Sequence, residues 1–196
     1  MTIIFLLVSY LLGSIPTGYI LFLLSEKKDI RSFGSKATGA TNVMRVKGWK
    51  YGVIVATFDI LKGFLPVFLA LKFLPNKHLA LACGLLAVIG HCYPVYIKFK
   101  GGKGVATSIG AYAALSVPPL LLSLVVFIMI VIITRFVSLG SIIAVFSYPI
   151  FAYTLKAPMP VVYFSLIVFL LILFQHRENI LRLIQGKERK LGGKIK

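Results

Sequence analysis

Long apolar stretches separated by short polar connections are the first feature of this sequence. Residues 2–24, 52–74 and 79–97 each approach the length of about 20 residues that a helix needs to cross a membrane. Residues 105–133 are too long for one untilted span, and Pro118 and Pro119 lie in their middle. Adjacent prolines fit a helix start much better than a helix interior. We therefore predict a short helix near 104–116 and a longer one near 118–134.

Two further apolar stretches complete the pattern. After a connection at Arg135–Ser141, a sixth stretch runs to about Leu155, and a seventh lies near 160–175. The basic tail from Gln175 begins with the apolar and charged alternation of an amphipathic helix. The pattern predicts an all-α, multi-pass integral membrane protein with seven transmembrane helices in a single domain over 1–196.

The first stretch and the connection after it each carry a local signal. Gly13, Pro16 and Gly18 interrupt the first stretch and predict a kink or close packing there. Residues 25–51 are too long for a tight turn, and apolar residues alternate there with small polar ones. We expect this connection to fold against the membrane face.

Charge distribution predicts the orientation. The 196 residues are 59% hydrophobic and include 22 Lys and Arg against 5 Asp and Glu, a formal net charge of +17. If the seven helices alternate in direction, 18 of the 22 basic residues fall on one side of the membrane. Basic loops stay in the cytoplasm, so we expect the N-terminus outside and the C-terminus in the cytoplasm. Nucleic acid is disfavoured as a partner, because these residues lie between membrane helices; anionic lipid or small anionic substrates fit better.

Two charged residues lie well inside a predicted span, away from the loops, and a histidine lies within another. Asp59 and Lys62 stand at i and i+3, where they can pair on one helix face. Such residues normally face the protein interior, so the pair is either structural or orients an active site. His91 lies near the end of its span, ahead of a glycine-rich loop. It is either an interfacial histidine or a contact that supports this loop.

The glycine-rich loop, Phe99–Ser108, is the strongest candidate for chemistry. Gly101, Gly102 and Gly104 surround Lys103, and a helix is expected to begin near Val105. Backbone N–H groups, one ammonium and a helix N-terminus together suit a phosphate. The nucleotide phosphate loop is excluded, because it needs a hydroxyl residue after the lysine and Gly104 stands there. A plain turn between two helices is the alternative.

Other polar clusters fall on the same predicted side of the membrane and offer groups for a small anionic substrate. Arg45 can hold a phosphate in a bidentate manner, and Lys103 acts as a point charge. Hydroxyl donors are Ser35, Thr41 and Ser141, and neutral donors are Asn42 and Asn179. The alternative is that these polar loops only attract anionic lipid headgroups.

Missing groups narrow the chemistry. The cytoplasmic loops have no carboxylate cluster for magnesium, no cysteine and no serine in a nucleophile elbow. The remaining mechanism is direct attack by a substrate hydroxyl, helped by positioning and charge stabilisation. The sequence indicates no metal, no cofactor and no obligate protein partner.

Six ordered motifs carry a resemblance to a known family. The motifs are GATNVMR, FDILKG, GHCYP, FKGGKGVAT, SLG and HRENILRL. Together they closely resemble the bacterial PlsY-type glycerol-3-phosphate acyltransferases, over essentially the whole chain. The resemblance implies acyl transfer from acyl phosphate to the 1-hydroxyl of glycerol 3-phosphate, giving lysophosphatidic acid. It also implies the bacterial plasma membrane, with the active site toward the cytoplasm.

The same resemblance implies roles for single residues. Gly101, Gly102, Lys103 and Gly104 would hold the substrate phosphate, and Ser35, Arg45 and Ser141 would complete the pocket. His176 and Asn179 would stand at the reacting centre. One departure is SKAT at 35–38, where the family usually reads Ser-Gly-Asn-Pro. The rival from another class is a transporter or channel for a small phosphorylated anion, which would show an inverted repeat and midplane charges.

Overall fold

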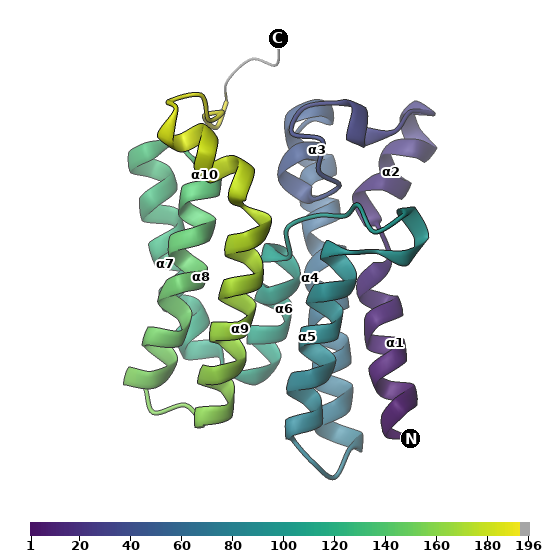
Figure 1. Ribbon diagram of the computed structural model, residues 1–196, viewed down its shortest axis with the longest axis vertical. Helices are drawn as coiled ribbons and strands as arrows, with labels where there is room; N and C mark the ends of the chain where they lie inside the picture. Colours follow the sequence, from purple (N-terminus) through teal and green to yellow (C-terminus); the bar gives the residue numbers. More distant parts are fainter. Residues whose placement is uncertain (193–196) are drawn as a thin grey trace. The chain divides into compact units, whose positions relative to one another are not determined.

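Helices and turns form the described part of the chain. The computed structural model describes residues 1–192, and these contain no β-strand. They divide into two compact units, 1–114 and 115–192, and each is described by itself. Figure 1 labels the helices of both units.

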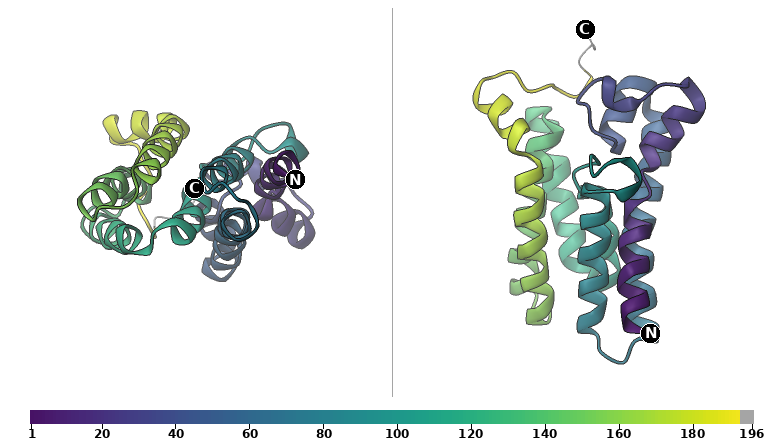
Figure 2. Two further views of the ribbon diagram at one scale, coloured as in Figure 1. Left: turned by 90° about the horizontal axis from the view of Figure 1, so that it is seen from below. Right: turned by 45° about the vertical axis from the view of Figure 1, so that its right-hand side comes forward.

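Unit 1 is built on three long helical segments. Its helices are α1 (Thr2–Ser14), α2 (Thr17–Glu26), η1 (Ile30–Ser32), α3 (Ala40–Lys47), α4 (Trp49–Phe73), α5 (His78–Cys92), η2 (Val95–Ile97) and α6 (Val105–Leu115), whose last residue belongs to unit 2. Both α1 and α4 pack along α5, and α3 packs on α4 (Figures 1 and 2).

A break between α1 and α2 confirms the kink predicted for the first stretch. Pro16 has no N–H to continue the helical ladder, and the backbone leaves the helical conformation at Ile15 and Pro16. The Ile15 carbonyl accepts a hydrogen bond from Lys62 Nζ at 2.8 Å. The buried Lys62 thus satisfies a backbone group that the break exposes, which a membrane interior requires.

Small residues bring the helices of unit 1 close together. A methyl group added at Gly13 would lie 2.2 Å from the Ala87 carbonyl oxygen on α5. One added at Gly63 on α4 would lie 2.0 Å from the Thr107 carbonyl oxygen on α6. Such contacts between backbones are typical of helix packing in membranes.

The long connection 25–51 is folded, as predicted. It forms η1 and α3, and Val43 on α3 is fully buried beside Phe22, Ile30 and Val55. Trp49, at the start of α4, is 66% exposed, so most of its ring lies outside the packing of the unit.

Unit 2 is a bundle of three helices followed by a short one. It contains α7 (Val117–Thr134), α8 (Val137–Thr154), α9 (Met159–Gln175) and α10 (Arg177–Ile184). α8 packs against both α7 and α9 (Figure 1). Pro118 and Pro119 lie in the first turn of α7, as the sequence predicts.

One predicted connection proved to be helical. Residues 138–141, expected between two spans, lie in the first turns of α8, which begins at Val137. A methyl group at Gly140 would lie 2.6 Å from Val131 Cγ2 on α7. Gly140, in the segment predicted as a connection, here allows close helix packing.

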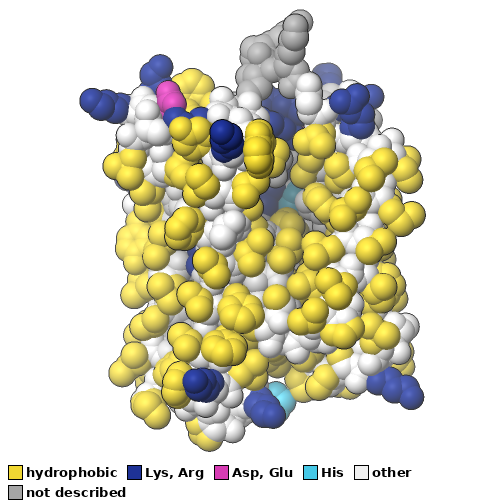
Figure 3. All heavy atoms as spheres, turned by 180° about the vertical axis from the view of Figure 1, so that it is seen from behind, with side chains coloured by type: hydrophobic (Ala, Val, Ile, Leu, Met, Phe, Trp, Pro, Cys, Tyr) yellow, Lys and Arg dark blue, Asp and Glu magenta, His cyan; other side chains and the backbone are white. Residues whose placement is uncertain are grey.

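The helices of the described residues carry the apolar character of a membrane protein. Five segments are long and apolar enough to cross a membrane, or six if the bent pair α9 and α10 is one span; these are Thr2–Glu26, Trp49–Phe73, His78–Ile97, Val117–Thr134, Val137–Thr154 and the bent pair. The pair bends by 60° (Figure 2, right). α6 is apolar but shorter. On the face drawn in Figure 3, apolar side chains cover most of the surface, and most Lys and Arg lie near its upper and lower edges.

Candidate active site

The predicted site residues fall into two groups, one in each unit. Ser35, Thr41, Asn42, Arg45 and the glycine loop belong to unit 1. Ser141, His176 and Asn179 belong to unit 2. Each group is organised by its own hydrogen bonds.

Asn42 organises the loop that carries Ser35. It lies in the first turn of α3, 1% exposed, and its Nδ2 donates to the carbonyls of Phe33 at 3.1 Å and Ala37 at 2.9 Å. Its Oδ1 accepts the Ser35 N–H at 2.7 Å. Both amide hydrogens are used inside the loop, so the direct donation to a substrate predicted for Asn42 is replaced by a positioning role.

The rest of this group stands on or beside α3. Ser35 is half-buried in the loop that Asn42 holds, and Thr41 and Arg45 are half-buried on α3. Between them Lys36 has a φ of +61°, a left-handed conformation that favours glycine. The departure from the family sequence at position 36 therefore falls where the backbone strains a side chain.

Two glycines of the glycine loop pack against the end of α5. Gly101 N–H donates to the Cys92 carbonyl at 3.2 Å, and Gly102 N–H to the His91 carbonyl at 3.0 Å. The prediction of free N–H groups is therefore wrong for these two residues, because the loop closes onto the end of α5. Gly104 has a φ of +85°, and its carbonyl accepts the Ser108 N–H at 2.8 Å as α6 begins.

The start of α6 keeps the features from which an anion site was predicted. The N–H groups of Val105, Ala106 and Thr107 have no partner inside the helix, since a helix leaves its first N–H groups unpaired. Lys103 is half-buried two residues before them. The helix start near Val105 confirms the sequence prediction, and it joins a cation to a positive helix end.

Arg31 connects the segment 25–51 to the turn that precedes the glycine loop. Its Nη1 donates to the Ile97 carbonyl at 3.0 Å, and its Nη2 lies 2.7 Å from Asp29 Oδ2. Hydrogen bonds from Arg31 hold the pKa of Asp29 below its ordinary value. The sequence gives no sign of this contact, because no periodicity connects residues 31 and 97.

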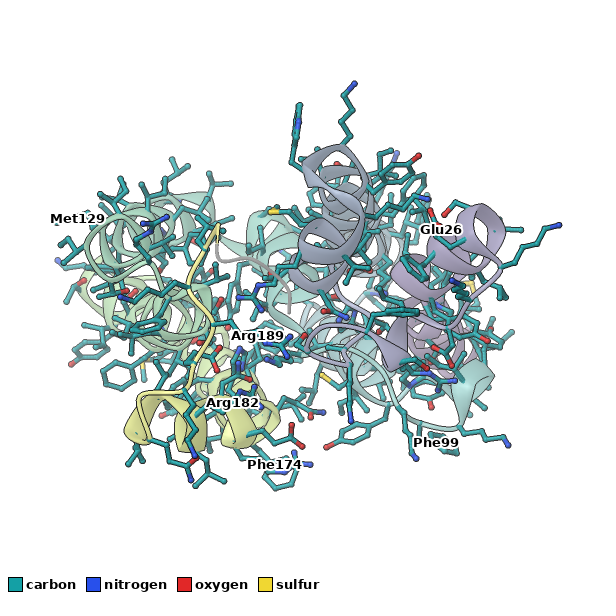
Figure 4. The ribbon with its side chains drawn as sticks, turned by 90° about the horizontal axis from the view of Figure 1, so that it is seen from above. Glu26, Phe99, Met129, Phe174, Arg182 and Arg189 are labelled. Atoms are coloured by element: carbon teal, nitrogen blue, oxygen red, sulfur yellow. The ribbon has the colours of Figure 1, made fainter. Side chains whose placement is uncertain are left out.

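In unit 2 a buried carboxylate holds Asn179. Asn179 is 3% exposed on α10, and its Nδ2 donates to Glu188 Oε1 at 2.7 Å. Ser138 Oγ on α8 donates to the same oxygen at 2.9 Å. Arg182 Nε donates to Glu188 Oε2 at 2.9 Å; Arg182 is labelled on α10 in Figure 4. The tail thus folds back and fixes the amide of Asn179.

Glu188 is a second residue beside the candidate site that the sequence alone did not single out. It lies in a basic tail that reads as a solvated segment, yet only 2% of its side chain is exposed. Burial acts to raise the pKa of Glu188, but hydrogen bonds from Arg182, Asn179 and Ser138 lower it below its ordinary value. The signal available was an acidic residue in a chain with only 5 of them.

His176 and Ser141 also have defined partners. His176 is 2% exposed between α9 and α10, and its Nδ1 lies 2.8 Å from the Ile172 carbonyl. A carbonyl only accepts, so Nδ1 carries a hydrogen; when the ring is neutral, Nε2 is its acceptor nitrogen. Ser141 Oγ donates to the Val137 carbonyl at 2.9 Å. The hydroxyl donation predicted for Ser141 therefore goes to its own helix in this structure.

Comparison with known proteins identifies the family. The sequence model described as glycerol-3-phosphate acyltransferase matches residues 3–186. The glycerol-3-phosphate acyltransferase of Endomicrobium trichonymphae is 45% identical over 190 residues, covering 96% of this chain and 95% of its relative. That of Syntrophotalea carbinolica is 44% identical over 189 residues, covering 95% and 96%.

Two crystal structures of PlsY (YgiH), an integral membrane glycerol 3-phosphate acyltransferase, share the fold. The glycerol 3-phosphate form has a TM-score of 0.93 and 42% identity, covering 97% of this chain and 96% of that one. The lysophosphatidic acid form has a TM-score of 0.90 and 41% identity, covering 97% and 95%. The chain belongs to the glycerol-3-phosphate acyltransferase family.

Proposed function

We propose that this chain transfers a fatty acyl group from acyl phosphate to the 1-hydroxyl of glycerol 3-phosphate, giving lysophosphatidic acid and inorganic phosphate. The observation that carries the proposal is the similarity to family members over nearly the whole chain. It is supported by Lys103 at the positive end of α6 and by the Glu188 network that fixes Asn179.

The reaction needs positioning more than chemical assistance. The 1-hydroxyl oxygen attacks the acyl carbonyl carbon and forms the ester bond, while the bond between that carbon and the phosphate oxygen breaks. Phosphate is a good leaving group, and a phosphate with a second pKa of about 6 can accept the hydroxyl proton. We assign this proton to a substrate phosphate, with Ser35, Arg45, Lys103 and Ser141 binding phosphate and His176 and Asn179 acting at the reacting group.

Phosphate release tests the function. Purified protein in detergent or lipid is given acyl phosphate with and without glycerol 3-phosphate, beside the variants Lys103→Ala and Lys100→Ala. Lys100 is an exposed lysine three residues away and serves as the matched control. We expect release that requires glycerol 3-phosphate, yields lysophosphatidic acid, and is lost only in Lys103→Ala. A folded wild-type protein without release would refute the acyltransferase.

The proposal includes a topology. Seven spans, with α6 as a short one, put the N-terminus outside and the basic connections and tail in the cytoplasm of the bacterial plasma membrane, where both units work as one domain. Lys27 and Lys77 are exposed and fall on opposite sides in this arrangement. A membrane-impermeant maleimide should label Lys77→Cys in intact cells and Lys27→Cys only after permeabilisation. The reverse pattern would overturn the orientation.

A further inference from the structure

Three buried polar side chains connect the interior of unit 1 to the glycine loop. Asp59, Lys62 and His91 are 1%, 7% and 6% exposed. Lys62 Nζ lies 2.8 Å from Asp59 Oδ1, and His91 Nδ1 lies 3.6 Å from the same oxygen. We call these three side chains the buried polar chain; it joins α4 to α5.

The far end of the buried polar chain touches the loop. A methyl group added at Gly102 would lie 2.1 Å from His91 Nε2, so the imidazole occupies the space that a side chain at position 102 would fill. The His91 carbonyl also accepts the Gly102 N–H at 3.0 Å. Gly102 is thus held by the backbone and the ring of one residue, and Lys103 follows it directly.

A purely structural ion pair does not account for His91. Lys62 already neutralises Asp59, and its ammonium also binds the Ile15 carbonyl at 2.8 Å. An ionisable ring in a membrane helix carries a cost that an apolar residue would avoid. What the ring adds is a contact with Asp59 on one edge and with Gly102 on the other. A buried ring packed between Asp59 and Gly102 has less room to move than an exposed side chain, so it can fix the position of the loop.

We propose that His91 is a positioning residue for the glycine loop, that it sets the place of Lys103 and of the first turn of α6, and that the Asp59–Lys62 pair holds its ring. The inference rests on the proposed function, because the ligand that senses this position is the phosphate of glycerol 3-phosphate. Loss of this positioning weakens phosphate binding more than it slows the reaction of the bound complex. The signature is therefore a raised KM for glycerol 3-phosphate with a smaller change in kcat.

Four variants test this in the full-length protein. His91→Ala removes the ring, His91→Gln keeps an amide that reaches toward Gly102, and the double variant Asp59→Asn/Lys62→Met removes the pair without leaving a lone charge. His78→Gln is the matched control, since His78 is exposed at the other end of α5. Phosphate release at varied glycerol 3-phosphate gives KM and kcat, calorimetry gives the dissociation constant of glycerol 3-phosphate, and thermal unfolding reports the folded fraction.

We expect His91→Ala to raise KM and the dissociation constant about tenfold, with kcat changed about threefold or less. His91→Gln should recover part of this loss, and the double variant should shift KM in the same direction. Adding His91→Ala to the double variant should raise KM little further, because the effects of substitutions within one network are not additive. His78→Gln should behave as wild type.

Distinct outcomes overturn the two proposals. If wild type is active and folded His91 variants keep its KM and dissociation constant, His91 does not position the loop, while the function stands. A lowered melting temperature with unchanged binding also refutes positioning. If His91→Ala does not fold, His91→Gln and the double variant decide by the same constants. A wild-type protein that binds glycerol 3-phosphate without turnover refutes only the proposed acyltransferase function. A wild-type protein that neither binds glycerol 3-phosphate nor turns it over refutes both the function and the role of His91.

Discussion

Asn179 Nδ2 donates a hydrogen bond of 2.7 Å to a carboxylate oxygen of Glu188, nine residues further along the chain. Both side chains are buried, and Ser138 donates to the same oxygen. The amide of Asn179 therefore cannot rotate without breaking a charge-assisted bond. An acidic residue in a basic tail thus positions a residue assigned to the reacting group.

Glu188→Gln should destabilise the protein in a way that depends on pH. The amide keeps the size of Glu188 but loses the charge, so we expect a loss of about 2 kcal/mol, as is typical for hydrogen bonds to a charged group. The pKa of Glu188 is lowered in the folded protein, so its contribution is present above the ordinary value of 4.5 and is lost as pH falls through the lowered value. Denaturant unfolding of both proteins from pH 7 downward measures this.

The control for Glu188 is Glu178→Gln. Glu178 is 70% exposed, and it lies 3.7 Å from Arg182, so its loss should change the free energy of unfolding very little. The wild-type advantage over Glu188→Gln should shrink only in acid. An advantage that is equally large far below pH 4.5 would show that the charge of Glu188 is not its source.

Lys36→Gly should stabilise the protein. A side chain in the left-handed region costs about 1–2 kcal/mol, and glycine loses about 0.5–1 kcal/mol more backbone entropy on folding. Strain relief is the larger effect, so we expect a gain of about 0.5–1 kcal/mol in the free energy of unfolding by denaturant. Lys36→Ala, which removes the charge but keeps the φ of +61°, should give no such gain. Equal gains would point to charge and not to backbone strain.

Lys62→Met should destabilise the protein more than a double change that removes both charges. The single variant leaves Asp59 buried without its cation and leaves the Ile15 carbonyl without the Lys62 bond, a loss of about 3–5 kcal/mol. Asp59→Asn/Lys62→Met removes the lone charge and should cost less. Lys72→Met, an exposed change on the same helix, is the control in thermal unfolding. A double variant less stable than Lys62→Met would contradict this account.

The sequence predicts helix positions well, because apolar length and proline placement depend on local rules. Pro16 breaks a helix and Pro118 starts one, as their missing N–H groups dictate. Roles that depend on distant neighbours were less accessible. Glu188 reads as part of a solvated basic run until the tail folds back onto α8, and Gly102 reads as a ligand-binding glycine until His91 is seen beside it.

Ser138 illustrates the remaining difficulty. Serine and glycine indicate a connection in a soluble protein, but they also allow close approach of membrane helices. Only the packing of α8 on α7 distinguishes the two. Within α8, Ser138 donates a hydrogen bond to Glu188 of the tail. Local composition alone therefore misplaced the start of this helix.

His176→Ala should reduce turnover without abolishing it. If a substrate phosphate accepts the proton of the 1-hydroxyl, the His176 ring only helps to position the reacting group. A general base typically accelerates a reaction roughly 100-fold to 10,000-fold, so we expect a smaller loss in kcat than this. The acidic limb of the pH–rate profile should persist near the phosphate pKa of about 6. His176 Nδ1 is bound to the Ile172 carbonyl, so thermal unfolding of the variant must accompany the kinetics. A larger loss in a folded variant that still binds glycerol 3-phosphate, with the acidic limb gone, would make His176 Nε2 the base.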